Sequence, residues 1–159
     1  MVVSQDKVVL RRTLKATPEQ LFDAFSKADA LMAWHAPEGM VTPIAEADLR
    51  IGGAYRITME QTAESPMGPA GARHTVRGVY REIDRPRKLV FTWAWDKEEG
   101  APEFMGDETL VTIEFRATEG GNTELVLTHE LLKTEESRAS HEQGWTSVLN
   151  KLEQYIGGR

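Results

Sequence analysis

The chain has 159 residues, no cysteine and a formal net charge of −6. This length predicts one domain over residues 1–159, because domains most often have about 100–150 residues. The absence of cysteine excludes disulfides, thiolate nucleophiles and cysteine-bound metals, and the acidic balance argues against a nucleic-acid partner, which requires a basic patch.

The N-terminus and the hydropathy of the chain predict a cytoplasmic location. There is no stretch of about 18 apolar residues to span a membrane. Residues 1–6 also lack the basic and apolar regions of a signal peptide. We therefore expect neither a membrane span nor secretion.

The first forty residues predict a strand followed by two short helices. Residues 7–14 are rich in side chains that favour strands. Thr17, Pro18 and Gln20 then supply an N-cap, a proline at the first helical position and a glutamine at the third, which is the pattern of a capping box. We expect a second short helix over residues 29–34, ended by the proline- and glycine-containing turn that follows it.

Residues 41–132 predict a meander of six antiparallel strands. Apolar and polar residues alternate along most of these strands, which is typical of a sheet with one buried face. The expected boundaries include a strand end near Ile51, a strand start at Ala54, strands over 88–96, 109–117 and 123–132, and proline- and glycine-rich loops at 62–72 and 97–108 that we expect to be mobile.

Residues 135–156 predict one long amphipathic helix. Its apolar residues, from Trp145 to Ile156, recur at three- and four-residue steps and so form a single stripe that must lie against the sheet. Gly144 is unusual beside this stripe, because an interior glycine costs a helix about 1 kcal/mol relative to alanine. Two interpretations stay open. The missing side chain leaves room for a ligand, or it allows the helix backbone to pack closely on a strand.

A resemblance to a known family rests on motifs spread over nearly the whole chain. The matching segments are Thr17-Pro18-Glu19-Gln20-Leu21-Phe22, Trp34, residues 48–56, 78–84, 86–93 and 123–129, and Gly144-Trp145. In this order they resemble the α+β helix-grip fold of the START/Bet v-like (SRPBCC) superfamily, in which a curved antiparallel sheet wraps around a long C-terminal helix. Within it, the chain resembles the family named after the C-terminal domain of the activator of the heat-shock-protein-90 ATPase.

Metal and nucleophile motifs are incomplete in this sequence. His129-Glu130 and His141-Glu142 each begin like a zinc-protease motif, but Lys133 and Trp145 stand where the second histidine would be. No serine lies in a Gly-x-Ser-x-Gly elbow, and no glycine-rich phosphate loop precedes a helix. We therefore expect no metal, no cofactor and no catalytic residue, although His129 on the buried face has two interpretations, a hydrogen-bonded core histidine or a proton carrier.

We expect one internal pocket between the sheet and the C-terminal helix, open toward the second short helix. The resemblance implies a hollow there, and alternate residues of the central strands share the face that the helix covers. Gly78 and Gly144 would add space. The expected ligand-binding residues are Trp34, Tyr55, Met59, His74, Tyr80, Phe91, Trp93, His129, His141 and Trp145.

The expected function is the binding of a small apolar or aromatic metabolite. An aromatic core without a ligand is the ordinary interpretation of any one of these side chains. The superfamily implies two further alternatives, a cavity enzyme of the aromatase/cyclase or hydrolase type and a module that binds a chaperone. The chaperone alternative is weakened because the eukaryotic activator has an additional N-terminal domain and this chain begins directly at the first strand.

Overall fold

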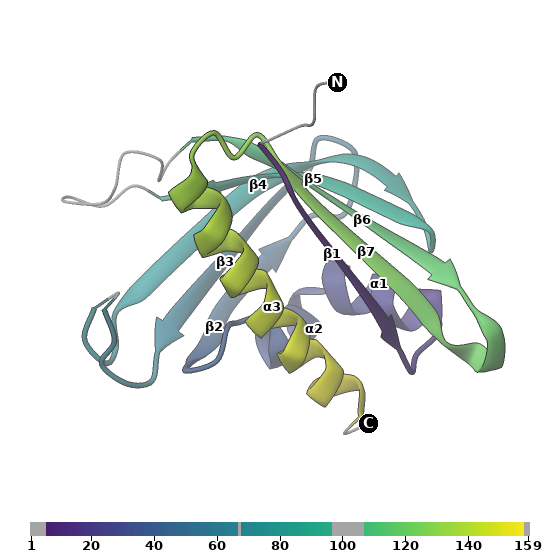
Figure 1. The fold of residues 1–159 in the computed structure, drawn as a ribbon, viewed down its shortest axis with the longest axis horizontal. Helices are drawn as coiled ribbons and strands as arrows, with labels where there is room; N and C mark the ends of the chain where they lie inside the picture. The colour runs from purple at the N-terminus through teal and green to yellow at the C-terminus, as the bar shows by residue number, and fades with distance from the viewer. Residues whose placement is uncertain (1–5, 67, 97–106, 158–159) are drawn as a thin grey trace.

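The computed structural model describes residues 6–66, 68–96 and 107–157, and its elements follow the predicted order (Figure 1). The strands are β1 (Val8–Leu14), β2 (Met40–Ala47), β3 (Ala54–Gln61), β4 (Arg73–Asp84), β5 (Lys88–Trp95), β6 (Thr109–Ala117) and β7 (Thr123–Glu130). The helices are α1 (Pro18–Ser26), α2 (Ala28–Trp34) and α3 (Glu135–Gly157), and a 3-10 turn, η1 (Glu119–Gly121), joins β6 to β7. None of the described helices is long and apolar enough to cross a membrane.

The seven strands form one antiparallel sheet in the order β1-β7-β6-β5-β4-β3-β2. The sheet curls, α3 runs across its open side, and α1 and α2 lie at one end (Figure 1). This is the predicted α+β helix-grip fold, and the prediction is confirmed. The meander of β2 to β7 is local in sequence, whereas β1 joins the sheet only through β7.

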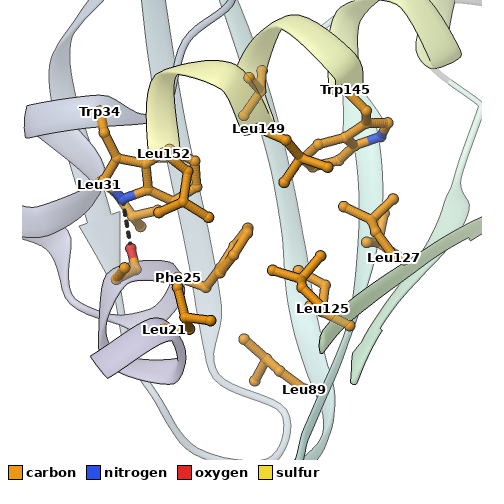
Figure 2. Packing of buried hydrophobic residues seen from close by; sticks show 14 of the residues in the cluster. Leu21, Phe25, Leu31, Trp34, Leu89, Leu125, Leu127, Trp145, Leu149 and Leu152 are labelled. Carbon is orange, nitrogen blue, oxygen red and sulfur yellow. Dashed lines mark hydrogen bonds between the residues drawn. The ribbon is translucent and has the colours of Figure 1, made fainter. Parts of the chain in front are cut away.

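The core lies between the concave face of the sheet and all three helices. Figure 2 shows Leu125 and Leu127 of the sheet facing Trp145 and Leu149 of α3, with Phe25 of α1 beside them. The predicted stripe of α3 is buried at Trp145, Val148, Leu149, Leu152 and Ile156 and partly buried at Tyr155, so the helix-to-sheet packing inferred from its periodicity is confirmed. Burial of large apolar side chains provides the main stabilisation of such an interface.

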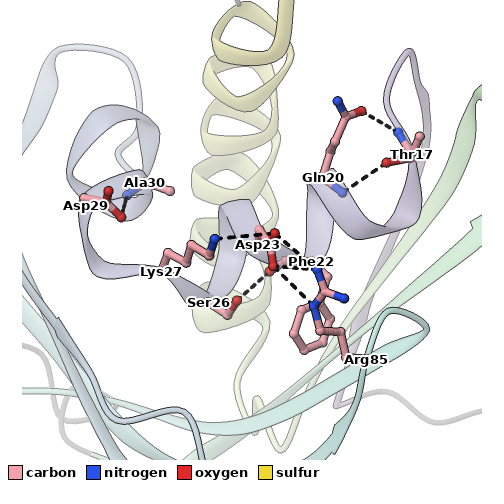
Figure 3. Close-up of polar contacts among 9 residues, drawn as sticks. All are labelled: Thr17, Gln20, Phe22, Asp23, Ser26, Lys27, Asp29, Ala30 and Arg85. Carbon is pink, nitrogen blue, oxygen red and sulfur yellow. Dashed lines mark hydrogen bonds and ion pairs between the residues drawn. The ribbon is translucent and has the colours of Figure 1, made fainter.

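Helix α1 begins with the predicted capping box. The backbone N–H of Gln20 donates to the Thr17 hydroxyl, and the Gln20 side chain accepts from the Thr17 N–H (Figure 3). Asp23 on the same helix pairs with Arg85, from the β4–β5 turn, and with Lys27 (Figure 3). Because these ion pairs are exposed, they contribute little, and the fully buried Leu21 is the stronger anchor of this helix.

Two strand boundaries differ from the sequence prediction. β2 ends at Ala47 rather than near Ile51, because a turn begins with the hydrogen bond from the Asp48 N–H to the Ala54 carbonyl. β7 ends at Glu130 rather than at residue 132, because Leu131 has a left-handed backbone with φ of 69°. The expected loop at 97–108 falls mostly on residues 97–106, which lie outside the described residues.

Gly78 and Gly144 have opposite surroundings. Gly78 on β4 pairs with Tyr55 of β3, and the Tyr55 hydroxyl reaches over it to donate to the Thr92 carbonyl on β5. A Cβ at Gly78 would overlap the backbone carbonyl of Thr92. At Gly144, apart from its neighbours and the nearby backbone of its own helix, no described atom lies within 4 Å of the position of a Cβ. The expectation that Gly78 adds space therefore fails, because the strands approach closely there. At Gly144 the open Cβ position contradicts the alternative that the helix backbone packs closely on a strand.

These surroundings predict opposite effects of alanine at the two glycines. Gly78→Ala must push β4 away from Thr92 and is expected to lower the free energy of unfolding by about 1–3 kcal/mol, the usual cost of overpacking. Gly144→Ala is the matched control, and it should raise stability by up to about 1 kcal/mol through helix propensity. Urea unfolding checks both values. Equal effects at the two positions would contradict the difference in packing.

Candidate functional site

A small cavity lies where α1 and α2 meet the middle of the sheet. Its lining is mostly aromatic and comes from both helices, the residue after α2 and three strands. The lining residues are Phe25, Leu31, His35, Tyr55, Ile57, Tyr80, Phe91 and Trp93. Its volume is about 10 Å³, close to the space that one water molecule requires.

The aromatic wall is held by ring contacts and one hydrogen bond. The Tyr55 ring lies edge-on to Phe91 with centroids 5.4 Å apart, and it is 5.6 Å from the Tyr80 ring. The Tyr55 hydroxyl is engaged by the Thr92 carbonyl. Burial raises the pKa of Tyr55 well above its usual value and that of Tyr80 to about 12, with nearby Asp48 adding to the effect at Tyr80. Both phenols therefore keep their protons at neutral pH.

Two residues of the cavity lining each carry a buried polar atom that has no hydrogen-bond partner among the described residues. The atoms are Nδ1 of His35 and Nε1 of Trp93. The two rings have centroids 6.1 Å apart. Burial lowers the pKa of His35 to about 4, so the imidazole is neutral at pH 7. A buried polar group without a partner costs about 1–3 kcal/mol, and two of them on one cavity are unusual in a folded protein.

His129, next to this cavity, belongs to a linear series of hydrogen bonds. The Trp145 indole N–H donates to His129 Nδ1 at 2.9 Å, and His129 Nε2 lies 2.7 Å from the Thr109 hydroxyl. That hydroxyl donates to the Trp93 carbonyl at 2.8 Å. Because an indole can only donate, the His129 proton must be on Nε2, and the series runs in one direction from Trp145 to Trp93.

This series of hydrogen bonds identifies His129 as a hydrogen-bonded core histidine rather than a proton carrier. Both ring nitrogens are engaged, and a second proton would set an N–H against the N–H of Trp145. Burial, with a smaller effect of His141, lowers the pKa of His129 to about 2. Of the two interpretations made from the sequence, the hydrogen-bonded core histidine therefore fits the observed geometry.

His141 repeats the same arrangement with the opposite tautomer. Its Nε2 accepts from the Trp95 indole N–H at 3.2 Å, and its Nδ1 lies 2.7 Å from the Ser137 carbonyl, to which it donates. Its ring centroid is 4.7 Å from that of His129. Burial lowers the pKa of His141 as well, so the two facing imidazoles are both neutral.

The ten residues expected from the sequence fall into three groups. Four of them line the cavity, and they are Tyr55, Tyr80, Phe91 and Trp93. His129, His141 and Trp145 form an adjoining cluster, in contact with Trp93 through Trp145 at 4.8 Å between centroids. Trp34, Met59 and His74 do not line it.

The three residues outside the lining have other contacts. The Trp34 indole donates to the Ala24 carbonyl and its ring packs on Phe25 (Figure 2). Met59 is part of the buried core, and it pairs in register with His74 across β3 and β4. The His74 ring is half-buried and its Nε2 lies 2.8 Å from the Gln61 side-chain oxygen.

Sequence reasoning missed four lining residues, which are Phe25, Leu31, His35 and Ile57. Three are ordinary core side chains on elements that were predicted correctly. His35 was assigned only to the turn that ends α2. The available signal was its position directly after Trp34, at the end of a helix that had to pack against the sheet.

The connection between α2 and β2, residues 35–39, contacts α3 through the ring of His35 on Trp145 and through a hydrogen bond at Glu38, and the next residue, Met40, is bonded to α3 as well. The backbone N–H of Glu38 donates to the Ser147 hydroxyl at 2.6 Å, and the Lys151 ammonium donates to the Met40 carbonyl at 3.2 Å. The first of these bonds is exposed. Among the residues that the structure describes, no group of three potential ligands could hold a metal ion.

Comparisons with known proteins give a family and a set of similar folds. The family model described as Activator of Hsp90 ATPase homolog 1-like protein matches residues 15–157. A search of curated proteins found no match.

Solved bacterial structures extend the similarity over almost the full chain. The AHSA1 protein of Silicibacter pomeroyi is 28% identical with a TM-score of 0.78, and the match covers 95% of this chain and 97% of that chain. A Chromobacterium violaceum protein is 26% identical with the same TM-score, covering 94% and 96%. The AHSA1-like protein of Aeromonas hydrophila is 20% identical with a TM-score of 0.69, covering 96% and 92%, and is similar in fold alone.

Proposed function

The chain belongs to the Activator of Hsp90 ATPase homolog 1-like family, and we propose that it binds a small, mostly apolar molecule between its sheet and the helices α1 and α2. The sequence predicted a pocket between the sheet and α3, but none of the lining residues of the cavity belongs to α3. The observation that carries the proposal is the aromatic cavity beside α2, whose lining residues carry two buried polar atoms without partners. Apolar walls with a few polar groups are typical of small-molecule sites. The helix-grip fold of the family is compatible with such a site.

Binding must enlarge this cavity. Sites for drug-sized molecules usually have about 300–1,000 Å³, far above the 10 Å³ of this cavity. The segment that can yield is residues 37–39, which follow His35, because they are half-buried or exposed and the hydrogen bond from Glu38 to Ser147 that ties them to α3 is itself exposed. A ligand that displaces this segment outward exchanges an exposed hydrogen bond for buried apolar contact, which is favourable at about 25 cal/mol per Å² of apolar surface.

The neighbouring histidine cluster supports binding more than catalysis. His129 and His141 use both of their ring nitrogens in fixed hydrogen bonds, so neither is free to exchange a proton with a bound molecule. The family's name also suggests that a chaperone is a partner of this protein. That role stays a prediction, and a pull-down from cell lysate with the folded protein would test it.

A blocking variant tests the proposed function. A panel of fatty acids, flavonoids and polyketide-like aromatics is titrated while tryptophan fluorescence and the thermal midpoint are followed. A ligand at 100 times its Kd stabilises the fold by about 2.7 kcal/mol and should raise the midpoint by several degrees. We expect Leu31→Phe, which fills the cavity, to abolish this shift. Met32→Phe is the matched control, because Met32 is the next residue on α2 and is exposed.

The control and native mass spectrometry decide the outcome. Met32→Phe should bind like the unchanged protein, and native mass spectrometry of the purified protein should reveal a retained apolar compound. If no compound in the panel changes fluorescence or midpoint, the proposed function is wrong. If Leu31→Phe still binds, the site lies elsewhere in the protein.

A further inference from the structure

The two unpartnered atoms of the cavity specify more than an apolar ligand. Trp93 Nε1 is an obligatory donor, because an indole nitrogen has no lone pair to offer. His35 Nδ1 either accepts or donates, depending on the tautomer of the ring. Both side chains are almost fully buried, at 4% and 3% exposure, so bulk water does not satisfy them.

Several other polar groups in or beside the cavity already have hydrogen-bond partners. The Tyr55 hydroxyl donates to the Thr92 carbonyl, and the two indoles of the adjoining cluster, Trp95 and Trp145, donate to histidine nitrogens. Among the residues that line the cavity, His35 and Trp93 are the two that carry a fully buried polar atom without a partner, and their ring centroids lie 6.1 Å apart.

Resting on the proposed function, we propose that the ligand of this site carries an uncharged oxygen, a phenolic or alcoholic hydroxyl or a carbonyl, held between Trp93 Nε1–H and His35 Nδ1. A hydroxyl accepts from the indole and donates to a bare imidazole nitrogen. A carbonyl accepts from both if the imidazole proton is on Nδ1. In either case one oxygen removes two buried unpartnered groups, each of which otherwise weakens the folded state.

The same chemistry excludes an anionic head group. A carboxylate would enter an apolar, aromatic site in which the only imidazole is neutral at pH 7, because burial lowers its pKa. No lysine or arginine is among the lining residues. An unpaired buried charge is far more costly than a buried neutral dipole. The site therefore favours neutral hydroxyl- or carbonyl-bearing aromatic compounds over fatty acids and aromatic acids.

Three single-ring probes of similar shape separate these chemistries. The probes are 4-fluorophenol, 4-fluorotoluene and 4-fluorobenzoate, with binding measured by fluorine NMR at pH 7. We expect 4-fluorophenol to bind about tenfold more tightly than 4-fluorotoluene, since a site with buried polar groups rejects the analogue that leaves them unpaired. 4-Fluorobenzoate should bind weakest of the three.

The indole N–H signals provide a direct readout. The Trp93 signal, identified by its loss in Trp93→Phe, should move downfield with 4-fluorophenol and not with 4-fluorotoluene. His35→Phe keeps a ring at the position and should remove most of the preference for the phenol. His74→Phe is the matched control, because His74 does not line the cavity, and it should retain the full preference.

The outcomes separate this inference from the function on which it rests. Equal binding of the phenol and the toluene, or a preference that survives in His35→Phe, would overturn the oxygen site while leaving apolar binding intact. Tightest binding of 4-fluorobenzoate would also overturn it. If none of the three probes nor any compound of the broader panel binds, the proposed function itself fails.

Discussion

Replacing Trp145 with alanine is expected to lower the free energy of unfolding by about 3–5 kcal/mol, the usual cost of truncating a large buried aromatic side chain. Trp145 is 3% exposed and packs on Trp93 with centroids 4.8 Å apart. It also supplies the N–H that donates to His129 Nδ1. Its loss therefore opens a cavity at the contact of α3 with the sheet and leaves a buried acceptor unpaired. Urea unfolding followed by circular dichroism measures the change.

A second substitution separates packing from hydrogen bonding at this position. Trp145→Phe keeps most of the ring and removes the indole N–H, so it should cost at least about 1–3 kcal/mol for the unpaired His129 nitrogen. Tyr155→Phe on the same helix is the control and should change stability by less than about 0.5 kcal/mol, because Tyr155 is only partly buried. An unchanged midpoint in Trp145→Ala would show that α3 is not anchored through this side chain.

Acid is expected to destabilise the fold through its buried histidines. The folded-state pKa is lowered to about 4 at His35 and about 2 at His129, from a usual value near 6.5, chiefly because burial disfavours the charged form. The unfolded chain therefore binds protons more readily than the folded one below pH 6.5. Their contribution is fully present above that pH and is lost as the pH falls toward the lowered values.

The size of this effect is large for a domain of this length. Over the 2.5 pH units between 6.5 and 4, each of the two groups removes about 3 kcal/mol at 1.36 kcal/mol per unit. Urea unfolding at pH 7 and pH 4.5 measures the fall. His35→Phe should show a visibly smaller fall than the unchanged protein, because one of the titrating groups is gone. A fall of the same size in both proteins would mean that His35 is not buried in its neutral form.

The fold was predictable because local patterns and tertiary packing agree. The capping box at Thr17, the alternation along β3 and the stripe of α3 each indicate an element that the structure contains. The boundary errors near Ile51 and residue 132 have one cause. Backbone hydrogen bonds at Asp48 and a left-handed Leu131 end these strands, and side-chain type does not encode either feature strongly.

The candidate site was only partly predictable. Strand alternation placed Tyr55, Tyr80 and Trp93 on one face, and all three line the cavity. The same rule placed His74 on that face. Alternation gives the face on which a side chain lies but not its position along the strand, and His74 lies outside the cavity lining, beside Gln61. The periodicity of the sequence does not predict the position of His35. That position depends on how α2 packs against the sheet, which no local pattern specifies.

The strand order has a consequence for how the chain folds. β2 to β7 pair with sequence neighbours, so their contacts close short loops, whereas β1 must find β7, with Val8 facing His129. Closing such a long loop has a large entropic cost that only later contacts offset. We therefore expect that during synthesis the first strand has no strand partner until β7 has emerged, and that it joins the sheet after the meander has formed. The assembly step that completes the sheet also positions α3, since β7 leads directly into that helix.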